Sequence, residues 1–337
     1  MVESSEEKKK KTTTLPYLPH ELIFQILLRL PVKSLTRFKS VRKSWFSLIS
    51  APHFANSHFQ LTSAKHAASR IMFISTLSHE TRSIDFKAFL NDDDPASLNI
   101  TFSLTRSHFP VEIRGSCRGF ILLYRPPDIY IWNPSTGFKK HIHLSPVDSK
   151  SVAQCQGFGY DQSRDDYLVV SLSYNPSAFS THLKFFSVRD NTWKEIEGNY
   201  FPYGVLSSCR EGLLFNGVIH CCLRYLFQVI LSTEHQDILV YDNDKDTLEI
   251  WVMKEYKVHS SWNKTLVLSV DAIPDHYFHP IHSTKNGDII GRTLNSRLVK
   301  YNDKGQLLRH RTFFNSPSEV VMYTESLLSL PGDNEQV

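Results

Sequence analysis

The fold is decided by residues 18–54, which read LPHELIFQILLRLPVKSLTRFKSVRKSWFSLISAPHF. A helix is expected to begin just after Pro19, because the N–H that proline lacks would be unpaired at a helix start anyway. Pro31 ends this helix, since it restricts Leu30 and removes a backbone donor. Between the two prolines most residues are apolar. They are too many for the single apolar stripe of an amphipathic surface helix.

Two further short helices are predicted before Pro52, which should close the third. Each has apolar residues at helical spacing. In the second helix they are Val32, Leu35, Phe38 and Val41, and in the third they are Trp45, Leu48 and Ile49. Three short helices in about forty residues are too small a unit to bury this surface among themselves. Large exposed apolar patches mark interaction sites. The helices must therefore pack on the rest of the chain or on another protein.

This stretch resembles an F-box domain over its whole length. The matching residues are Leu18-Pro19, Glu21-Leu22, Ile26-Leu27, Leu30-Pro31-Val32-Lys33-Ser34-Leu35, Arg37-Phe38, Val41, Lys43-Ser44-Trp45, Leu48-Ile49 and Pro52-His53-Phe54. In that family the segment docks on a Skp-family adaptor, which sits on a cullin scaffold. The resemblance therefore implies a substrate-receptor subunit of an SCF-type ubiquitin ligase. Such a subunit is not an enzyme: it supplies proximity and leaves the chemistry to other subunits.

Docking of this kind is expected to place apolar helix residues in a groove of the adaptor. The predicted adaptor-binding residues are Leu18, Pro19, Leu22, Ile26, Leu27, Leu30, Pro31, Val32, Leu35, Phe38, Val41 and Trp45. Residues 15–60 are assigned to the F-box.

Composition indicates an intracellular globular protein. The chain of 337 residues is 41% hydrophobic and its formal charge is +4, which demands neither a nucleic acid nor a membrane as partner. The five cysteines are odd in number and form no CxxC pair, so we interpret them as reduced thiols. No apolar run approaches the roughly 20 residues that span a bilayer. A cytoplasmic or nuclear location is expected.

Residues 1–14 carry no apolar core of a signal peptide, and their polar composition predicts a disordered tail. Within the tail, residues 8–11 are four consecutive lysines. They fit a nuclear-import signal or simply a solvated tail.

From about Arg70 the pattern changes to short runs rich in Ile, Val, Phe and Tyr, typical of strands in an all-β domain. Four hairpins recur at intervals of roughly 50 to 60 residues, near the period of a kelch blade. Their strands and turns are Ile129–Trp132 with Asn133–Gly137, Leu183–Phe186 with Arg189–Thr192, Ile238–Tyr241 with Asp242–Asp246, and Leu298–Tyr301 with Asn302–Gly305. Radial repetition of such units protects sheet edges.

Residues 70–315 resemble the plant F-box-associated, kelch-like domain, which implies a propeller-like fold. The matching residues are Trp132-Asn133-Pro134-Ser135-Thr136, Gly157-Phe158-Gly159-Tyr160-Asp161, Asp165-Asp166-Tyr167, Phe186-Ser187 with Trp193, Asn216-Gly217-Val218-Ile219-His220, and residues 250–256 with Ser261-Trp262. The predicted fold class is thus α+β multidomain, with a small all-α F-box before a mostly β domain. Cys221-Cys222 replaces the family's usual Trp-Leu, and the short segment that follows predicts an incomplete blade. Residues 316–337 are assigned to a C-terminal tail.

Other functions were weighed against this one. His141 and His143 lie two apart on a strand face, but no third ligand is evident, so no metal and no cofactor are predicted. Two acidic segments fit turns better than calcium-binding loops. They are the pair Asp165-Asp166 and the alternating residues Asp242, Asp244 and Asp246.

Two binding functions remain as alternatives to the ligase subunit. The basic residues Lys33, Arg37, Lys39, Arg42 and Lys43 would suit a nucleic acid, although an acidic partner protein suits them equally. A glycan-binding propeller would stack sugars on Tyr124, Trp132, Tyr203 or Trp262. The sequence does not name the substrate, because exposed loops decide it.

Overall fold

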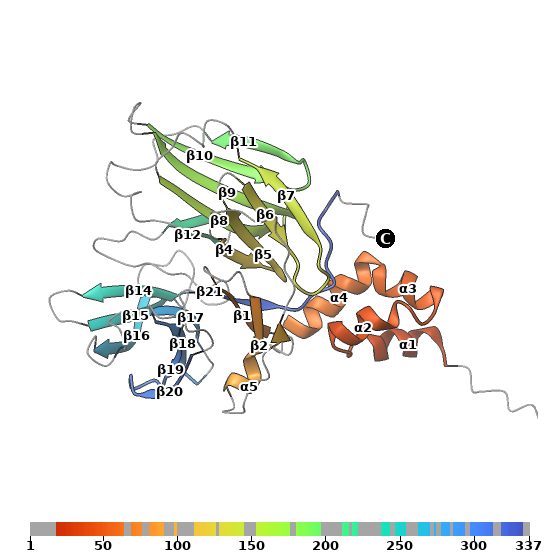
Figure 1. Cartoon of the computed structure of the whole chain (residues 1–337), viewed down its shortest axis with the longest axis horizontal. Coiled ribbons are helices and arrows are strands. Elements are labelled where there is room, and N and C mark those ends of the chain that lie inside the picture. The colour runs from red at the N-terminus through yellow and green to blue at the C-terminus, as the bar shows by residue number, and fades with distance from the viewer. Residues whose placement is uncertain are drawn as a thin grey trace, which may run out of the picture.

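The computed structural model describes residues 18–63, 69–75, 81–90, 98–99, 111–125, 128–144, 153–175, 180–196, 211–215, 218–221, 237–242, 247–253, 262–269, 273, 278–283, 286–293, 297–312 and 318–332. The predicted disordered tail and its four lysines lie outside these residues. Within them, helices come first and strands make up nearly all of the rest (Figure 1). None of the described helices has the length and apolar character needed to cross a membrane.

Four consecutive helices form the N-terminal unit: α1 (His20–Leu27), α2 (Val32–Phe38), α3 (Lys43–Ser50) and α4 (Pro52–Ser63). The helix predicted after Pro19 is α1, and Pro31 directly precedes α2. The third helix, α3, ends at Ser50, two residues before the proline predicted to close it, but Pro52 also opens α4, which was not predicted. Proline is well tolerated at the first helical position, where its missing N–H costs nothing. A fifth short helix, α5 (Phe86–Leu90), was also missed.

The strands form five sheets among the described residues. The first, in the order β21-β1-β2-β3, contains Ser318–Thr324, Ser69–Ser75, Thr81–Asp85 and Leu98–Asn99. The second contains β4 (Glu112–Cys117), β5 (Phe120–Arg125), β6 (Asp128–Trp132) and β7 (Lys139–His143) in chain order. The third has the order β11-β10-β9-β8-β12-β13, with bounds Thr192–Ile196, Ser180–Ser187, Asp166–Asn175, Ala153–Asp161, Glu211–Phe215 and Val218–Cys221.

The last two sheets lie late in the chain. The fourth contains β14 (Asp237–Asp242), β15 (Thr247–Met253) and β16 (Trp262–Ser269). The fifth contains β17 (His279–Ser283), β18 (Ile289–Arg292), β19 (Arg297–Tyr301) and β20 (Leu307–Thr312). The predicted class, a helical F-box followed by a mostly β domain, is confirmed.

All four hairpins predicted from the repeat are present. They are the antiparallel pairs β6–β7, β10–β11, β14–β15 and β19–β20. Where an incomplete blade was predicted, the two-stranded hairpin β12–β13 is joined to its neighbour by parallel pairing of β12 with β8. In the described part of the chain this hairpin therefore has no sheet of its own.

The segment predicted as a C-terminal tail is instead part of the fold. Its residues 318–324 form β21, which pairs antiparallel with β1 and so joins the two ends of the β domain in one sheet. The residues that follow, 326–330, form a C-terminal strap that lies mostly buried. Buried Asn133 holds this strap, because its Nδ2 lies within hydrogen-bonding distance of the carbonyl oxygens of Ser326 and Leu328, at 3.2 and 3.3 Å.

The strap was missed because its partners are remote in sequence. The Trp132-Asn133-Pro134-Ser135-Thr136 motif makes a hairpin turn and also binds the strap, since the backbone N–H of Ser326 donates to Ser135 Oγ at 3.1 Å. No local sequence pattern in residues 325–332 predicts that contact. The strap matters for function because its leucines pack in the same core as the N-terminal helices.

That shared core joins the helical unit to the β domain. It contains Leu27, Leu35 and Phe54 from the helices, Phe120 and Ile131 from the second sheet, and further buried residues from the third sheet and the strap. The helices lie at one side of the molecule, with the strap running between them and the sheets (Figure 1). The N-terminal unit is therefore packed against the β domain while part of its surface stays outside.

Candidate docking surface

The N-terminal helices expose several large apolar side chains that the shared core leaves uncovered. Their exposed fractions are 49% for Leu18, 51% for Leu22, 51% for Ile26, 65% for Val41 and 36% for Phe46. We call these five residues the docking set. Leu22 and Ile26 are four residues apart on α1, so they lie one above the other on the same helix face. Val41 lies in the turn between α2 and α3, and Phe46 lies on α3.

Three of the predicted adaptor-binding residues are instead core residues. Leu27, Val32 and Leu35 are buried in the cluster shared with the β domain and cannot contact a partner as the helices stand. The sequence could not separate them from Leu22 and Ile26, because all five are apolar residues on short helices. The side that faces inward depends on the packing of α1 and α2 against the β domain.

The other predicted residues divide between partial burial and exposure. Leu30, Phe38 and Trp45 are partly buried and pack on the core, with the Phe38 and Trp45 ring centroids 5.4 Å apart. Pro19 and Pro31 are exposed. Phe46 was missed: it follows Trp45 directly, so it lies about 100° around the helix from the residue that packs inward.

His58 on α4 fixes how the helices pack. Its side chain is fully buried, and its Nε2 lies 2.9 Å from the carbonyl oxygen of Leu30, in the turn between α1 and α2. A carbonyl can only accept, so Nε2 carries the proton and donates it. The Nδ1 atom is buried without a hydrogen-bond partner. Burial lowers the pKa of His58 from its ordinary value of 6.5, outweighing the opposing effect of the Leu30 hydrogen bond. The helical unit is therefore built around a neutral histidine.

Positive charge is concentrated on α2, α3 and their turn, the part of the helical unit that carries Val41 and Phe46 of the docking set. Lys33, Arg37, Arg42 and Lys43 are exposed on α2, α3 and the turn that joins them. Lys39 is partly buried, with its Nζ 5.9 Å from the centroid of the Phe46 ring, and burial lowers its pKa. Exposed apolar groups with a basic rim fit a protein partner whose contact surface is apolar at its centre and acidic at its edge.

Arg118 ties the helical unit to the β domain. It lies in the β4–β5 turn, and its guanidinium donates to Asn56 Oδ1 of α4 at 2.9 Å. The same group lies over the rings of Phe59 and Tyr160, 5.3 and 4.0 Å from their centroids. Cation–π contacts of this kind add to the apolar packing. The docking set is thus carried on helices that are fixed to the sheets by a polar contact as well as by the core.

Gly119 makes this turn possible. Its φ of +86° is a conformation that residues with a side chain rarely adopt, and an added Cβ would lie 2.2 Å from Ser326 Oγ and 2.8 Å from the carbonyl oxygen of Thr324. Strand β21 and the strap can therefore approach the turn only because this residue has no side chain. The same short segment, 118–119, contacts α4 on one side and the strap on the other.

The aromatic residues proposed for glycan stacking do not form a platform among the described residues. Trp132 is buried in the core between the first and second sheets. Tyr124 is partly buried and lies under the Arg114 guanidinium, 4.9 Å from its ring centroid. Tyr203 lies outside the described residues, and of the Trp262 side chain nothing is described.

The predicted acidic turn at Asp165-Asp166 is a turn, between β8 and β9. Asp166 is buried and accepts hydrogen bonds from the backbone N–H of Arg189 and from Ser187 Oγ, at 2.9 and 2.5 Å. Asp165 accepts from the Tyr160 hydroxyl and from Arg189, and these bonds hold the pKa of its carboxyl below the ordinary range. Both carboxylates therefore join the β8–β9 turn to the end of β10 and the turn that follows it. The Asp244 and Asp246 positions lie outside the described residues.

Burial explains the behaviour of the one cysteine whose side chain is described. Cys117 is a free thiol at the end of β4, and burial raises its pKa to about 12. A thiol so far from its thiolate form is a poor nucleophile and a poor metal ligand. The prediction of a reduced, unreactive cysteine therefore fits this position.

Comparison with known proteins identifies both parts of the chain. The F-box domain matches residues 15–56, and the F-box associated beta propeller domain matches residues 58–242. An F-box/kelch-repeat protein of Arabidopsis thaliana is 28% identical over 327 residues, covering 85% of this chain and 87% of that protein. The F-box protein CPR1 of Arabidopsis thaliana is 25% identical over 381 residues, covering 94% of this chain and 90% of that protein.

Similarity to solved structures is much weaker. Apo AztD from Citrobacter koseri is 10% identical with a TM-score of 0.38, covering 76% of this chain and 97% of that one. A likeness of that size says nothing about function. The two domain matches follow one another along the chain, in the same order as the helical unit and the sheets. The propeller match alone covers more than half of the residues of the chain. The chain belongs to the plant F-box proteins that carry a C-terminal F-box associated beta propeller domain.

Proposed function

We propose that this protein is a substrate-receptor subunit of an SCF-type cullin ubiquitin ligase. The single observation that carries the proposal is the docking set. An F-box packed on its own β domain still leaves Leu18, Leu22 and Ile26 about half exposed. Apolar side chains that are exposed together on one helix usually mark a site where a partner covers them.

The partner that fits is a Skp-family adaptor, which in turn joins a cullin scaffold. Membership of the F-box family supports this partner, and the apolar row on α1 suits docking of a helix in a groove. The exposed basic residues on α2 and α3 would suit an adaptor whose contact surface is acidic at its edge. Pro19 and Pro31, which are exposed at the starts of α1 and α2, complete the contact.

The β domain is the part that would hold a protein substrate for ubiquitination. Its packing against the helices supports a fixed geometry, because the shared core and the Arg118 contact join the two parts directly. A rigid receptor helps transfer by holding the substrate at a constant place relative to the rest of the ligase. The subunit itself is proposed to be non-catalytic and to work in the cytoplasm, the nucleus or both.

Capture from plant cells tests this role. The tagged chain should recover a Skp-family adaptor together with a cullin, whereas a variant with Leu22→Asp and Ile26→Asp should recover neither. A matched control changes Leu307 and Leu308 of β20 to aspartate, since these leucines are 40% and 52% exposed but lie outside the F-box. Failure of the folded wild-type chain to recover either protein would overturn the proposal, whereas equal recovery of the cullin by all three proteins would refute the docking set as the contact.

A further inference from the structure

Strands β6 and β7 bring two histidines and an aspartate to one place. The antiparallel register sets Asp128 opposite His143 and Tyr130 opposite His141. Because side chains alternate along a strand and opposite residues point to the same side, Asp128, His141 and His143 share one face of the hairpin. Ile142, between the histidines, is buried on the other face. The sequence showed the two histidines but hid the third group, which is distant along the chain.

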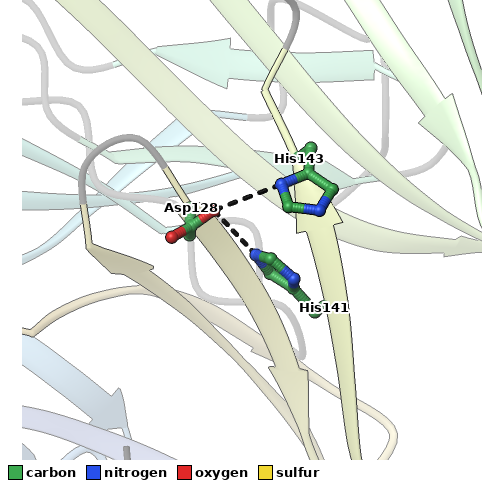
Figure 2. A group of neighbouring side chains, drawn as sticks. All are labelled: Asp128, His141 and His143. Carbon is green, nitrogen blue, oxygen red and sulfur yellow. Dashed lines mark hydrogen bonds and ion pairs between the residues drawn. The ribbon is translucent and has the colours of Figure 1, made fainter. Parts of the chain in front are cut away.

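The three side chains point toward one another, as Figure 2 shows. The Nε2 atom of His141 lies 2.7 Å from Asp128 Oδ1, and the Nδ1 atom of His143 lies 3.4 Å from the same oxygen. All three potential ligand atoms lie within 4.8 Å of one another. Tetrahedral ligands at roughly 2.1 Å from a zinc ion are about 3.4 Å apart. Of the observed distances, 3.4 Å matches that separation and 2.7 Å is shorter, so rotation of side chains without movement of the strands would complete a site.

Neighbouring groups hold the histidines in place. The His141 ring stacks on Tyr130, with 4.8 Å between centroids, and the Arg125 guanidinium lies 3.3 Å from the Tyr130 hydroxyl oxygen. Trp193 of β11 donates from Nε1 to the backbone carbonyl oxygen of His143 at 3.0 Å. The stacking thus restrains the His141 ring, whereas the Trp193 bond fixes the backbone of His143 and not its imidazole.

Exposure leaves the site accessible from solvent. The side chains of Asp128, His141 and His143 are 24%, 37% and 80% exposed. The least restrained of them, His143, is therefore the one with the freedom to turn toward an ion. The rings of the two histidines already meet edge to face, 4.0 Å between centroids.

We propose that Asp128, His141 and His143 form a binding site for a divalent metal ion of the zinc type. Two imidazoles and one carboxylate are a donor set for Zn²⁺ and related transition metals, whereas Mg²⁺ and Ca²⁺ prefer oxygen ligands alone. Three protein ligands leave one tetrahedral position for water or for a side chain of a bound protein. The metal would clip β6 to β7 at their open end.

The site lies at the end of the second sheet that is remote from the F-box. The β4–β5 turn, which contacts α4 through Arg118, is at one end of the sheet. Asp128 starts β6 and His143 ends β7, so both lie at the opposite end (Figure 1). The proposal depends only on this hairpin and stands whether or not the docking set binds an adaptor.

The test is to titrate the metal-free full-length chain with zinc chloride and to measure the heat of binding by calorimetry. One zinc ion per chain should bind at this site, and His143→Ala should weaken its binding by at least about 100-fold, since outer groups alone are worth 10–100-fold. Asp128→Asn should do the same. With Co²⁺ as the probe, the wild-type chain should show the visible absorption of tetrahedral coordination, and His143→Ala should lose it.

Two other histidines supply matched controls. His182 pairs with Glu195 across strands, Nδ1 to Oε1 at 2.9 Å, and thus offers a histidine and a carboxylate without a second imidazole. His310 is an exposed histidine on β20. His182→Ala and His310→Ala should leave zinc binding unchanged. Zinc binding that is absent in the wild type, or that is equal in wild type, His143→Ala and Asp128→Asn, would overturn the proposal.

Discussion

Aspartate at positions 22 and 26 should abolish adaptor binding without unfolding the chain. Leu22 and Ile26 are each 51% exposed, so a partner can still remove about half of each side chain from water. Complete burial of such a side chain is worth about 1.5–3 kcal/mol, so covering the remaining half contributes about 1 kcal/mol per residue. Loss of both apolar contacts therefore costs about 2 kcal/mol, or roughly 30-fold in Kd.

Aspartate does more than remove the contact. A carboxylate placed in an apolar groove loses its hydration without gaining a partner, which adds at least about 1 kcal/mol per residue. The total of about 4 kcal/mol corresponds to a loss of roughly 1000-fold in Kd. The double alanine variant separates the two effects, since it should show only the smaller, roughly 30-fold loss.

Isothermal titration of the full-length chain with a purified Skp-family adaptor measures this loss. The control with Leu307→Asp and Leu308→Asp carries the same added charge on equally exposed positions and should bind like wild type. Both aspartate variants should keep the wild-type melting temperature within a few degrees, because helix propensity at positions 22 and 26 and strand propensity at positions 307 and 308 each change stability by about 1 kcal/mol or less at exposed sites. A folded Leu22→Asp, Ile26→Asp chain that binds within tenfold of wild type would refute the assignment of α1 as the docking helix.

Three further predictions concern the packing that presents the docking set. Because burial lowers the pKa of His58 in the folded chain, the unfolded chain takes up its proton first as the pH falls below 6.5, and stability is lost there. The melting temperature should therefore drop between pH 7.5 and 5.5 less steeply in His58→Gln than in wild type, and equal slopes would contradict the role of His58. Gly119→Ala should destabilise the chain by more than about 1 kcal/mol in urea unfolding, because a Cβ meets Ser326 at a positive φ; an unchanged midpoint would show that the strap does not pack against this turn. Asn133→Ala leaves buried carbonyl oxygens of the strap without their donor and should cost about 1–3 kcal/mol in the same assay. It should also speed proteolysis near the C-terminus, because the strap has come loose. No change in either measurement would contradict the anchoring role of Asn133.

Local patterns predicted the elements well because each is encoded over a few residues. Pro19 and Pro31 set the starts of α1 and α2, and the turn residues 133–137 and 302–305 set two of the hairpins. The same local logic was incomplete at Pro52, which follows the end of α3 and also begins α4. Tertiary contacts such as that of His58 with Leu30 show that α4 belongs to the helical unit.

Contacts between remote residues could not be predicted. Leu22 and Leu27 look alike in the sequence, yet one is half exposed and the other is buried by a β domain whose core residues lie about a hundred positions away. Asn133 binds a strap nearly two hundred residues later. Asp128 becomes the third member of the histidine cluster only through the register of β6 and β7.

The affinity of the purified full-length chain for a Skp-family adaptor, measured at about 0.05 M and 0.5 M salt, tests the central claim most directly. Apolar docking predicts a stable complex at both salt concentrations, with Kd changing by less than about tenfold because burial of apolar surface does not weaken with salt. Absence of a complex from the folded chain would contradict the account. A loss of several powers of ten in affinity at the higher salt, as phosphate-like contacts produce, would show that the basic residues and not the docking set carry the binding.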